Sequence, residues 1–278
     1  MEDLKTLTKK LFPYAYNIIG NTADSQDIIQ DVLIKFNQKD LNSISNHNAY
    51  LIKAVINQSI NVKKKNDRER QQKITLPEPI ITNYGETKIE IEEILNYSML
   101  VLLDTLNTKE RAVFLLKEVF DYEHDEIAEI LTVSVENSRQ LLARGHKKLK
   151  SRKPDRISSS TKDRFYLEKY VETIRKGDVK TLEQMLTDEI RVLADGGSKL
   201  NVVAQLTSGI DDTIRLITYL FEHYQKNFEI KIEEINHQWA LLFYKDGILI
   251  NCQIFELNSD GKIANIFSVV DPEKLIHI

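Results

Sequence analysis

The chain has 278 residues, with 38 Lys and Arg against 42 Asp and Glu and a formal net charge of −4. This length allows two or three small domains or one large domain. With 42% apolar and 29% charged residues, the composition is that of a globular protein rather than a disordered or membrane protein. Taken as a whole, the acidic balance argues against a nucleic-acid-binding protein.

No stretch approaches the roughly 18 to 20 consecutive apolar residues of a membrane span, and the N-terminus MEDLKTLTKK lacks the apolar segment of a signal peptide. We therefore expect a cytoplasmic protein. Cys252 is the only cysteine, which excludes an intramolecular disulfide and a cysteine-rich zinc site, and its alternating surroundings indicate a small buried side chain. The six histidines show no metal-binding spacing, so we expect no metal and no cofactor.

The first 153 residues read as helices. One helix ends at Gly20, and a second begins at Thr22 or Asp24 and carries a broad apolar face up to Phe36. The polar stretch NQKDLNSISNHN predicts a loop, because Asn and Ser compete for backbone hydrogen bonds. A third helix runs from about Asn48 into a basic tail.

Further helices are predicted at about 91–103, 108–120, 121–131 and 135–150. Asn107 and Thr108 are predicted to cap the second of these helices, in which Thr108 followed by Arg111 is only a partial capping pattern. The last two helices are joined by the three residues TVS, and the final one ends in a cationic stretch. This is the helix-turn-helix arrangement.

Pro77, Pro79 and Pro154 lie in two irregular stretches, where we place linkers. After the second linker the pattern changes to short alternating strands, and Asp246-Gly247 and Asp260-Gly261 are hairpin signals. The order predicted is two helices at 163–177 and 178–186, strands at 188–195 and 199–206, a helix at 210–226, and strands at 228–235, 238–245, 248–257 and 262–270. We therefore expect an α+β domain on a curved antiparallel sheet.

The charge is distributed very unevenly. Residues 51–73 hold seven basic residues against two acidic ones, and residues 130–153 hold seven against one. Residues 74–129 hold four against thirteen, and residues 154–278 hold 15 against 20. Two separated cationic stretches, each after a helix, suit phosphate contacts at two places. The alternative is that each is a solvated helix end favoured by the helix dipole.

At this point the chain resembles a known family. The stretch DSQDIIQDVLIKF (residues 24–36) resembles region 2 of the extracytoplasmic-function (ECF) RNA polymerase sigma factors of the sigma-70 family, and residues 121–150 resemble their region 4. The third segment is similar to the SnoaL-like (NTF2-like) cone fold that one group of these factors carries. That group has WLPEP-, DGGGK/R- and NPDKL-type motifs, and TLPEP, DGGSK and DPEKL occur here in the same order, with Thr75 in place of the Trp.

The resemblance implies two all-α helical domains followed by an α+β cone-shaped domain with a curved sheet. The boundaries expected are region 2 at 1–73, a linker at 74–92, region 4 at 93–153, a second linker at 154–163, and the SnoaL-like domain at 164–278. The partners implied are core RNA polymerase, through its clamp and flap, and promoter DNA.

Four polar residues of the second helix project from one side, away from its apolar face: Asp24, Asp27, Gln30 and Asp31. An acidic helix face can meet a basic partner surface in a fixed orientation. The resemblance names that partner as the polymerase clamp. On charge patterning alone, the same residues are a solvated face.

The polar loop and the third helix correspond to the element that opens the promoter −10 region in the family. Asn side chains can hydrogen-bond base edges, and lysines can neutralise phosphates. The candidate residues are Asn46, Asn48, Lys53, Lys63, Lys64 and Lys65. Tyr50 is the nearest aromatic residue, and a core position at the helix start is favoured over base stacking.

In the second helix of the helix-turn-helix, side chains near the N-terminal half reach base edges, and later cations meet phosphates. Asn137, Arg139 and Gln140 are therefore the candidates for reading the −35 element, and Arg144, Lys147 and Lys148 the candidates for phosphate contacts. Gly145 interrupts this helix without a reason that the sequence supplies.

The C-terminal fold houses enzymes in other proteins, and an enzyme here would have to use Asp195, Asp271, His223, His237 or Tyr224. None has a partner at an evident spacing, so we expect no catalysis. The resemblance instead makes this domain a regulator in cis that contacts the linker. The contact candidates are Leu76, Pro77, Glu78, Pro79, Asp195, Gly196, Gly197, Lys199, Asp271, Pro272, Lys274 and Leu275.

The function expected is therefore a sigma factor that directs core RNA polymerase to promoters and is regulated in cis by its C-terminal domain. The alternative is a helix-turn-helix transcriptional regulator that senses a small molecule through the pocket of the cone fold. Whether that pocket holds a ligand stays open at this point.

Overall fold

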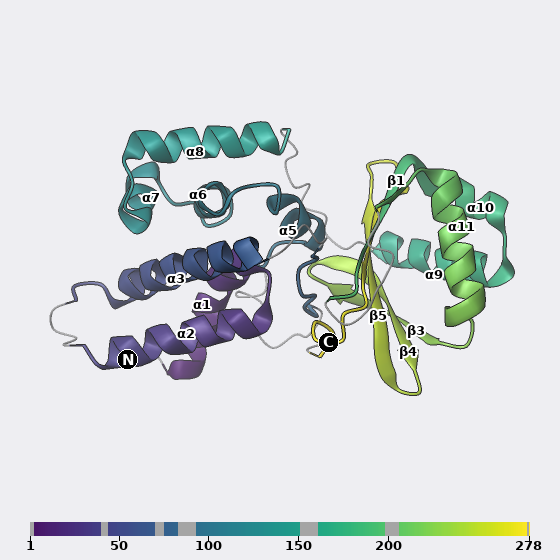
Figure 1. Ribbon diagram of the computed structural model, residues 1–278, viewed down its shortest axis with the longest axis horizontal. Coiled ribbons are helices and arrows are strands. Elements are labelled where there is room, and N and C mark those ends of the chain that lie inside the picture. The colour runs from purple at the N-terminus through teal and green to yellow at the C-terminus, as the bar shows by residue number, and fades with distance from the viewer. Residues whose placement is uncertain are drawn as a thin grey trace. The chain divides into compact units, whose positions relative to one another are not determined.

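The computed structural model describes residues 3–39, 44–69, 75–82, 93–150, 161–197, 206–276 and 278 (Figure 1). The chain divides into two compact units. Unit 1 comprises Met1–Gln72, Gly85–Leu95 and Met99–Asp155, and unit 2 comprises Lys73–Tyr84, Asn96–Ser98 and Arg156–Ile278. Each unit contains a hydrophobic core.

The first part of the chain is helical, as predicted. Its helices are α1 (Leu4–Ile19), α2 (Thr22–Asn37), α3 (His47–Glu69), α5 (Tyr97–Leu103), α6 (Thr108–Glu118), α7 (His124–Leu131) and α8 (Val135–Lys148). Gly20 ends α1 with φ 75°, a left-handed conformation that glycine adopts without strain. Asn21 then caps α2 by accepting a hydrogen bond from the Asp24 N–H at 2.8 Å.

Asn107, one of the two residues predicted to cap α6, is its cap. Asn107 Oδ1 accepts from the N–H of Glu110 at 2.9 Å, and Glu110 Oε2 accepts from the N–H of Asn107 at 3.0 Å. This is a complete capping box, in which the third helical residue is Glu110. The pairing of Thr108 with Arg111 was wrong, because Arg111 lies buried and bonds elsewhere.

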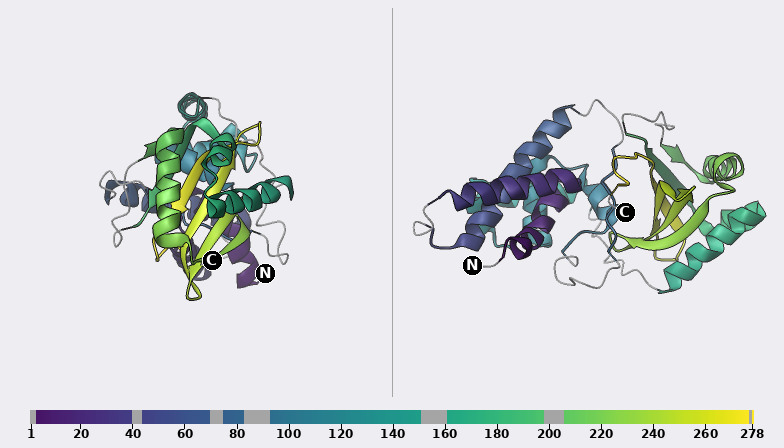
Figure 2. Two further views of the ribbon diagram at one scale, coloured as in Figure 1. Left: turned by 90° about the vertical axis from the view of Figure 1, so that its right-hand side faces the viewer. Right: turned by 90° about the horizontal axis from the view of Figure 1, so that it is seen from below.

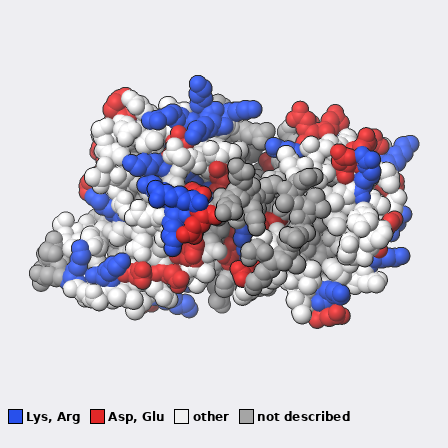
Figure 3. All heavy atoms as spheres, viewed as in Figure 1, with Lys and Arg blue, Asp and Glu red and all other residues white. Residues whose placement is uncertain are grey.

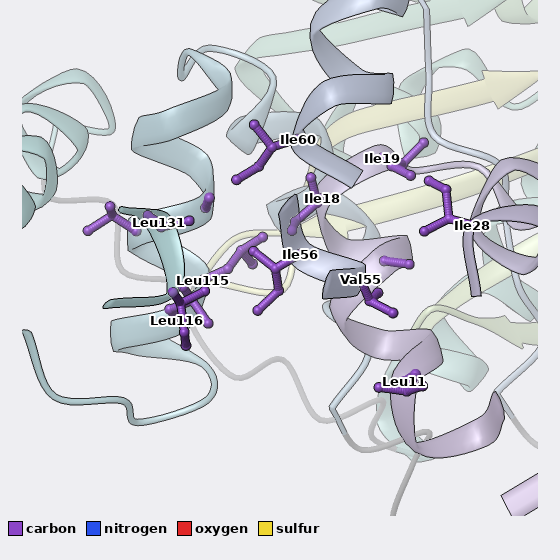
Figure 4. Packing of buried hydrophobic residues seen from close by; sticks show 14 of the residues in the cluster. Leu11, Ile18, Ile19, Ile28, Val55, Ile56, Ile60, Leu115, Leu116 and Leu131 are labelled. Atoms are coloured by element: carbon purple, nitrogen blue, oxygen red, sulfur yellow. The ribbon is translucent and has the colours of Figure 1, made fainter. Parts of the chain in front are cut away.

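A single hydrophobic cluster holds unit 1 together, with side chains from α1, α2, α3, α6, α7 and α8. Figure 4 shows Ile56 and Ile60 of α3 among residues of α1 and of the later helices. A polar contact joins the same helices: Asn57 Nδ2 of α3 donates to the Ile130 carbonyl of α7 at 2.8 Å. The two helical segments that the sequence predicts as separate domains therefore share one core.

Unit 2 is an α+β domain. Its helices are α9 (Thr161–Lys176), α10 (Val179–Met185) and α11 (Ile210–Leu220), and α11 passes into a π-helical turn η2 (Phe221–Gln225). The strands are β1 (Leu186–Asp195), β2 (Thr207–Ser208), β3 (Glu229–Ile235), β4 (Gln238–Lys245), β5 (Ile248–Leu257) and β6 (Ile263–Val269). In the left-hand view of Figure 2 the three helices lie in front of the strands.

The six strands form one sheet in the order β2-β1-β6-β5-β4-β3. Both Asp-Gly turns are present between adjacent antiparallel strands, with Gly247 and Gly261 at positive φ. The expectation of a wholly antiparallel sheet was wrong, because β1 pairs with β6 in parallel. Hairpin signals fix the direction of consecutive strands only, and β1 and β6 are far apart in the chain. Most of the strand predicted at 199–206 lies outside the described residues.

Candidate functional site

The outward face of α8 is the candidate DNA-reading surface. Ser134 caps the helix by accepting from the Asn137 N–H at 3.1 Å, and Ser138 and Leu141 are buried. The opposite side exposes Arg139, Gln140, Arg144, Lys147 and Lys148, whereas Asn137 is half-buried. Lys and Arg side chains gather over α8 at the upper edge of the view in Figure 3.

The basic residues of α8 differ in whether they have an ionic partner within the protein. Lys148 Nζ pairs with Glu110 Oε2 at 2.6 Å, and Glu110 is 2% exposed. Burial by itself would raise the pKa of the Glu110 carboxyl, but hydrogen bonds from Lys148 and from the Asn107 N–H outweigh it and lower that pKa. Lys148 therefore stabilises the start of α6. Within the described residues, Arg139 and Lys147 have no ionic partner, which leaves both available to phosphates.

Gly145 lies on the buried side of α8. A Cβ built there would meet Leu106 Cδ1 at 3.8 Å, which is an ordinary van der Waals contact. The structure therefore gives no steric reason for a glycine at this position.

The acidic face of α2 is only partly free. Asp24 Oδ2 accepts from Asn66 Nδ2 at 3.0 Å, and Asp31 Oδ2 accepts from Gln58 Nε2 at 3.2 Å, so both are oriented by α3. Asp27 and Gln30 are exposed.

Ile34 extends the exposed side of α2, with 56% of its surface exposed. It follows Gln30 by four residues and Asp31 by three, so it lies beside them on the helix surface. The sequence analysis did not name Ile34 as a candidate. The available signal was its spacing of three and four residues from Asp31 and Gln30, which places it on the same side of the helix.

Of the candidate −10 residues, Asn48 is exposed, and Asn46 Oδ1 accepts from the Ala49 N–H at 3.0 Å and so holds the start of α3. Lys53 Nζ lies 3.3 Å from Glu129 Oε1 of α7, and Lys65 is exposed, 4.0 Å from Glu69. Residues 40–43 of the loop lie outside the described residues. Tyr50 packs against the Phe36 ring, as a core residue at a helix start would.

The structure contradicts a surface role for Lys63. Only 5% of its side chain is exposed, and its Nζ lies 2.8 Å from Asp104 and 3.2 Å from Asp67. Arg111 shares Asp104, at 2.6 Å. Lys63 is therefore a buried cation in an ion cluster of unit 1 whose carboxylates, Asp67 and Asp104, are partly exposed.

Unit 2 brings the three sequence motifs together. Asp195 Oδ2 accepts from the Leu76 N–H at 2.7 Å and from Lys274 Nζ at 2.6 Å, and Asp195 Oδ1 accepts from the Gly197 N–H at 2.9 Å. Lys274 Nζ also donates to the Leu76 carbonyl. We call Leu76, Asp195, Gly197, Asp271 and Lys274 the linker clip.

Asp271 completes the linker clip by packing against Gly197. Gly197 has φ 63°, and a Cβ there would lie 2.2 Å from Asp271 Oδ2. Both the backbone and the space therefore require glycine. Of the other candidates, Pro77, Glu78, Pro79, Gly196 and Leu275 are buried, Pro272 is exposed, and Lys199 lies outside the described residues.

The rest of the linker segment continues along unit 2. The Tyr97 hydroxyl donates to the Pro77 carbonyl at 2.6 Å, and Asn236 Oδ1 accepts from the Ile80 N–H at 2.9 Å. Thr82 N–H donates to the Glu234 carbonyl at 3.0 Å. Asn236 stands in the tight turn between β3 and β4, a contact that no local sequence signal predicts.

The residues named for catalysis do not converge. Asp195 and Asp271 belong to the linker clip, His223 is exposed on η2, and His237 lies in the β3–β4 turn. The cavity of unit 2 contains Tyr224 in its lining, but among the described residues its lining has no carboxylate and no imidazole.

No helix in the described ranges is long and apolar enough to cross a membrane. The family Sigma-70, region 4, matches residues 98–149, which include α6, α7 and α8. The ECF RNA polymerase sigma factor SigJ of Mycobacterium tuberculosis is 24% identical, over 99% of this chain and 92% of that protein. The probable ECF RNA polymerase sigma factor SigI of the same organism is 21% identical, over 95% and 91%.

The fold agrees with these relatives. The crystal structure of Mycobacterium tuberculosis SigJ matches with a TM-score of 0.76 and 20% identity, over 97% of this chain and 96% of that one. Two helical regions followed by an α+β sheet domain are thus confirmed as the fold class. The chain is thus similar over nearly its whole length to ECF RNA polymerase sigma factors, and its helix-turn-helix lies in the segment that matches region 4 of the sigma-70 type.

Proposed function

We propose that this protein binds core RNA polymerase in the cytoplasm, directs it to promoters without catalysing a reaction itself, and is regulated in cis by unit 2. The observation that carries the proposal is the match of region 4 to a helix-turn-helix whose outward face presents Arg139 and Lys147. In this proposal Asn137, Arg139 and Gln140 read the −35 element, and Lys147 contacts phosphates.

Run-off transcription with purified core RNA polymerase tests the function. Arg139→Ala should lower promoter-specific transcript by roughly fivefold to 150-fold, because a base contact is worth roughly 1–3 kcal/mol. Arg175→Ala, the same change on an exposed site of α9, is the matched control and should leave it unchanged. If the protein never co-purifies with core polymerase yet binds duplex DNA tightly by itself, the alternative of a polymerase-independent regulator replaces this proposal.

The clamp-binding surface in this proposal is the exposed part of α2, at Asp27, Gln30 and Ile34. Reversing the charge with Asp27→Lys should weaken binding to core polymerase by roughly tenfold or more and make it less sensitive to salt. Glu183→Lys on α10 is the matched control. Equal loss in both variants would remove α2 from the interface.

For the regulatory role, the support is that the linker segment between regions 2 and 4 is held by charged, buried groups of unit 2. Releasing this segment alters the freedom of the chain that connects the two DNA-binding regions. Lys274→Met keeps the aliphatic stem of the side chain and removes the ammonium group, so it should change transcript yield at least threefold. Lys262→Met, at an exposed turn, is the control, and an unchanged yield in Lys274→Met refutes the regulatory role.

A further inference from the structure

Unit 2 contains a cavity of about 260 Å³ between its sheet and the segments α9, α11 and η2. All strands of the sheet contribute side chains to the lining, which is mostly apolar. In the described part of the chain this lining has no Asp, Glu, His, Lys or Arg. A charged occupant would therefore lose its hydration without gaining an ionic partner, which excludes charged ligands on energetic grounds.

Two donor groups in this lining, the Tyr170 hydroxyl and the Asn251 amide nitrogen, have no partner among the residues that the structure describes. Tyr170 is 1% exposed and Asn251 is 5% exposed, and both line the cavity. Ser268 Oγ donates to Asn251 Oδ1 at 2.9 Å, which leaves the Asn251 amide nitrogen to donate elsewhere. Throughout the described ranges, no protein atom pairs with the Tyr170 hydroxyl or with the Asn251 amide nitrogen.

Tyr166 is not among the described residues that line the cavity, and it serves as a comparison. It stands four residues before Tyr170 on the same helix, and its hydroxyl donates to the Met185 carbonyl at 2.8 Å. The Tyr170 hydroxyl and the Asn251 amide nitrogen are therefore two donors that an acceptor inside the cavity, from a ligand or from water, can satisfy.

The cavity also reaches the surface. Tyr224 of η2 and Ile250 of β5 both line it, and they are 60% and 39% exposed. Single π-helical turns at the end of α-helices are frequent at binding sites. The mouth of the cavity therefore lies where η2 faces β5.

We propose that this cavity is a binding site for a neutral, mainly apolar small molecule with one hydrogen-bond acceptor, held by Tyr170 or Asn251, and that its occupancy is transmitted to the linker clip. A 150 Å³ apolar cavity holds benzene, so about 260 Å³ corresponds to on the order of ten non-hydrogen atoms. A molecule with one ring or two fused rings would fit this volume. A single carbonyl or ether oxygen on it could accept a hydrogen bond from Tyr170 or Asn251.

The route to the linker clip runs through the ends of two strands. Ala194 lines the cavity and the next residue, Asp195, belongs to the linker clip; Val270 lines the cavity and the next residue, Asp271, belongs to the linker clip. The Val270 N–H donates to the Asp195 carbonyl at 2.9 Å, which ties the two ends together. A displacement of either strand end by a ligand therefore moves a linker clip residue. An effect of this displacement on transcription rests on the proposed function, in which unit 2 regulates the sigma factor in cis.

Binding is tested by calorimetric titration of the full chain with coumarin, a neutral fused-ring lactone, and with naphthalene, which lacks an acceptor. Coumarin should bind with a Kd below about 1 mM. Tyr170→Phe or Asn251→Leu should weaken it by roughly threefold to tenfold and leave naphthalene unchanged, because each removes a donor. Tyr166→Phe is the matched control, since its hydroxyl is already paired inside the protein.

Ile217→Trp fills the cavity from α11 and should abolish binding of both probes. The binding site is refuted if coumarin does not bind, if Ile217→Trp leaves its affinity unchanged, or if Tyr166→Phe weakens it as much as Tyr170→Phe and Asn251→Leu. Because Tyr170→Phe removes only an unpaired hydroxyl, it should not lower the stability of unit 2, which separates lost binding from lost folding.

Transmission is tested without polymerase by hydrogen exchange at the Leu76 amide, which donates to Asp195. Saturating coumarin should change its exchange rate at least threefold in the wild type and leave it unchanged in Ile217→Trp. An unchanged rate in ligand-saturated wild type refutes the transmission, whatever the outcome of the transcription experiments.

Discussion

Replacing Gly197 with alanine isolates the close contact inside the linker clip. Gly197 has φ 63° and Gly177, at the end of α9, has φ 66°, so an alanine at either position pays about 1–2 kcal/mol for a left-handed backbone. At Gly177 the added Cβ has nothing within 4 Å, whereas at Gly197 it lies 2.2 Å from Asp271 Oδ2. Moving Asp271 by more than 1 Å costs a further ~1–3 kcal/mol, typical of overpacking.

We therefore expect Gly177→Ala to lower the free energy of unfolding of unit 2 by about 1–2 kcal/mol, and Gly197→Ala by roughly 2–5 kcal/mol. The chain has one tryptophan, Trp239 in β4, so its fluorescence during urea denaturation reports on unit 2 within the full-length protein.

A double variant gives the decisive comparison. Gly197→Ala combined with Asp271→Ala removes the clash, so the two changes should couple favourably by ~1–3 kcal/mol. Equal losses in Gly177→Ala and Gly197→Ala, or purely additive losses in the double variant, would refute the reasoning, because the contact with Asp271 would then carry no energy.

Three further variants or labels test other parts of the structure. Gly145→Ala should stabilise unit 1 by about 0.5–1 kcal/mol, because alanine favours the helix and its Cβ meets only an ordinary contact at 3.8 Å; urea denaturation followed by helical circular dichroism measures it. Asp104→Ala should destabilise unit 1 by roughly 1–3 kcal/mol in the same assay, because it removes the partly exposed carboxylate that Lys63 and Arg111 share while Lys63 keeps Asp67; no measurable loss would contradict the ion cluster. Burial raises the pKa of the Cys252 thiol well above its usual value, so a thiol reagent at mildly alkaline pH should label native protein roughly a hundredfold more slowly than urea-unfolded protein.

Local sequence patterns were sufficient to predict the helices and strands and the exposed face of α8. Helical periodicity, the Gly20 stop and the Asp-Gly turns act over a few residues, so they could be read directly from the chain. The same holds for α8, where a 3.6-residue period separates buried Leu141 from exposed Arg139 and Lys147. The three motifs of the linker clip were also identified in the sequence, by resemblance.

What the sequence could not determine is which surfaces meet. Helical periodicity marks an apolar face on α3 but does not say that α6 and α7 cover it, nor that Lys63 is turned inward to Asp104. Strand alternation does not specify that β1 runs parallel to β6.

The sequence by itself determined most helical and strand elements and the helix-turn-helix, because these depend on interactions between near neighbours in the chain, and the motifs of the linker clip were identified by resemblance. Only the tertiary structure decided that Leu76, Asp195 and Lys274 share one buried hydrogen-bonded cluster, and that the Tyr170 hydroxyl and the Asn251 amide nitrogen line a cavity with no partner among the described residues. The physical reason is that burial and pairing between distant segments depend on how whole faces pack, and the spacing of residues along the chain does not carry that information.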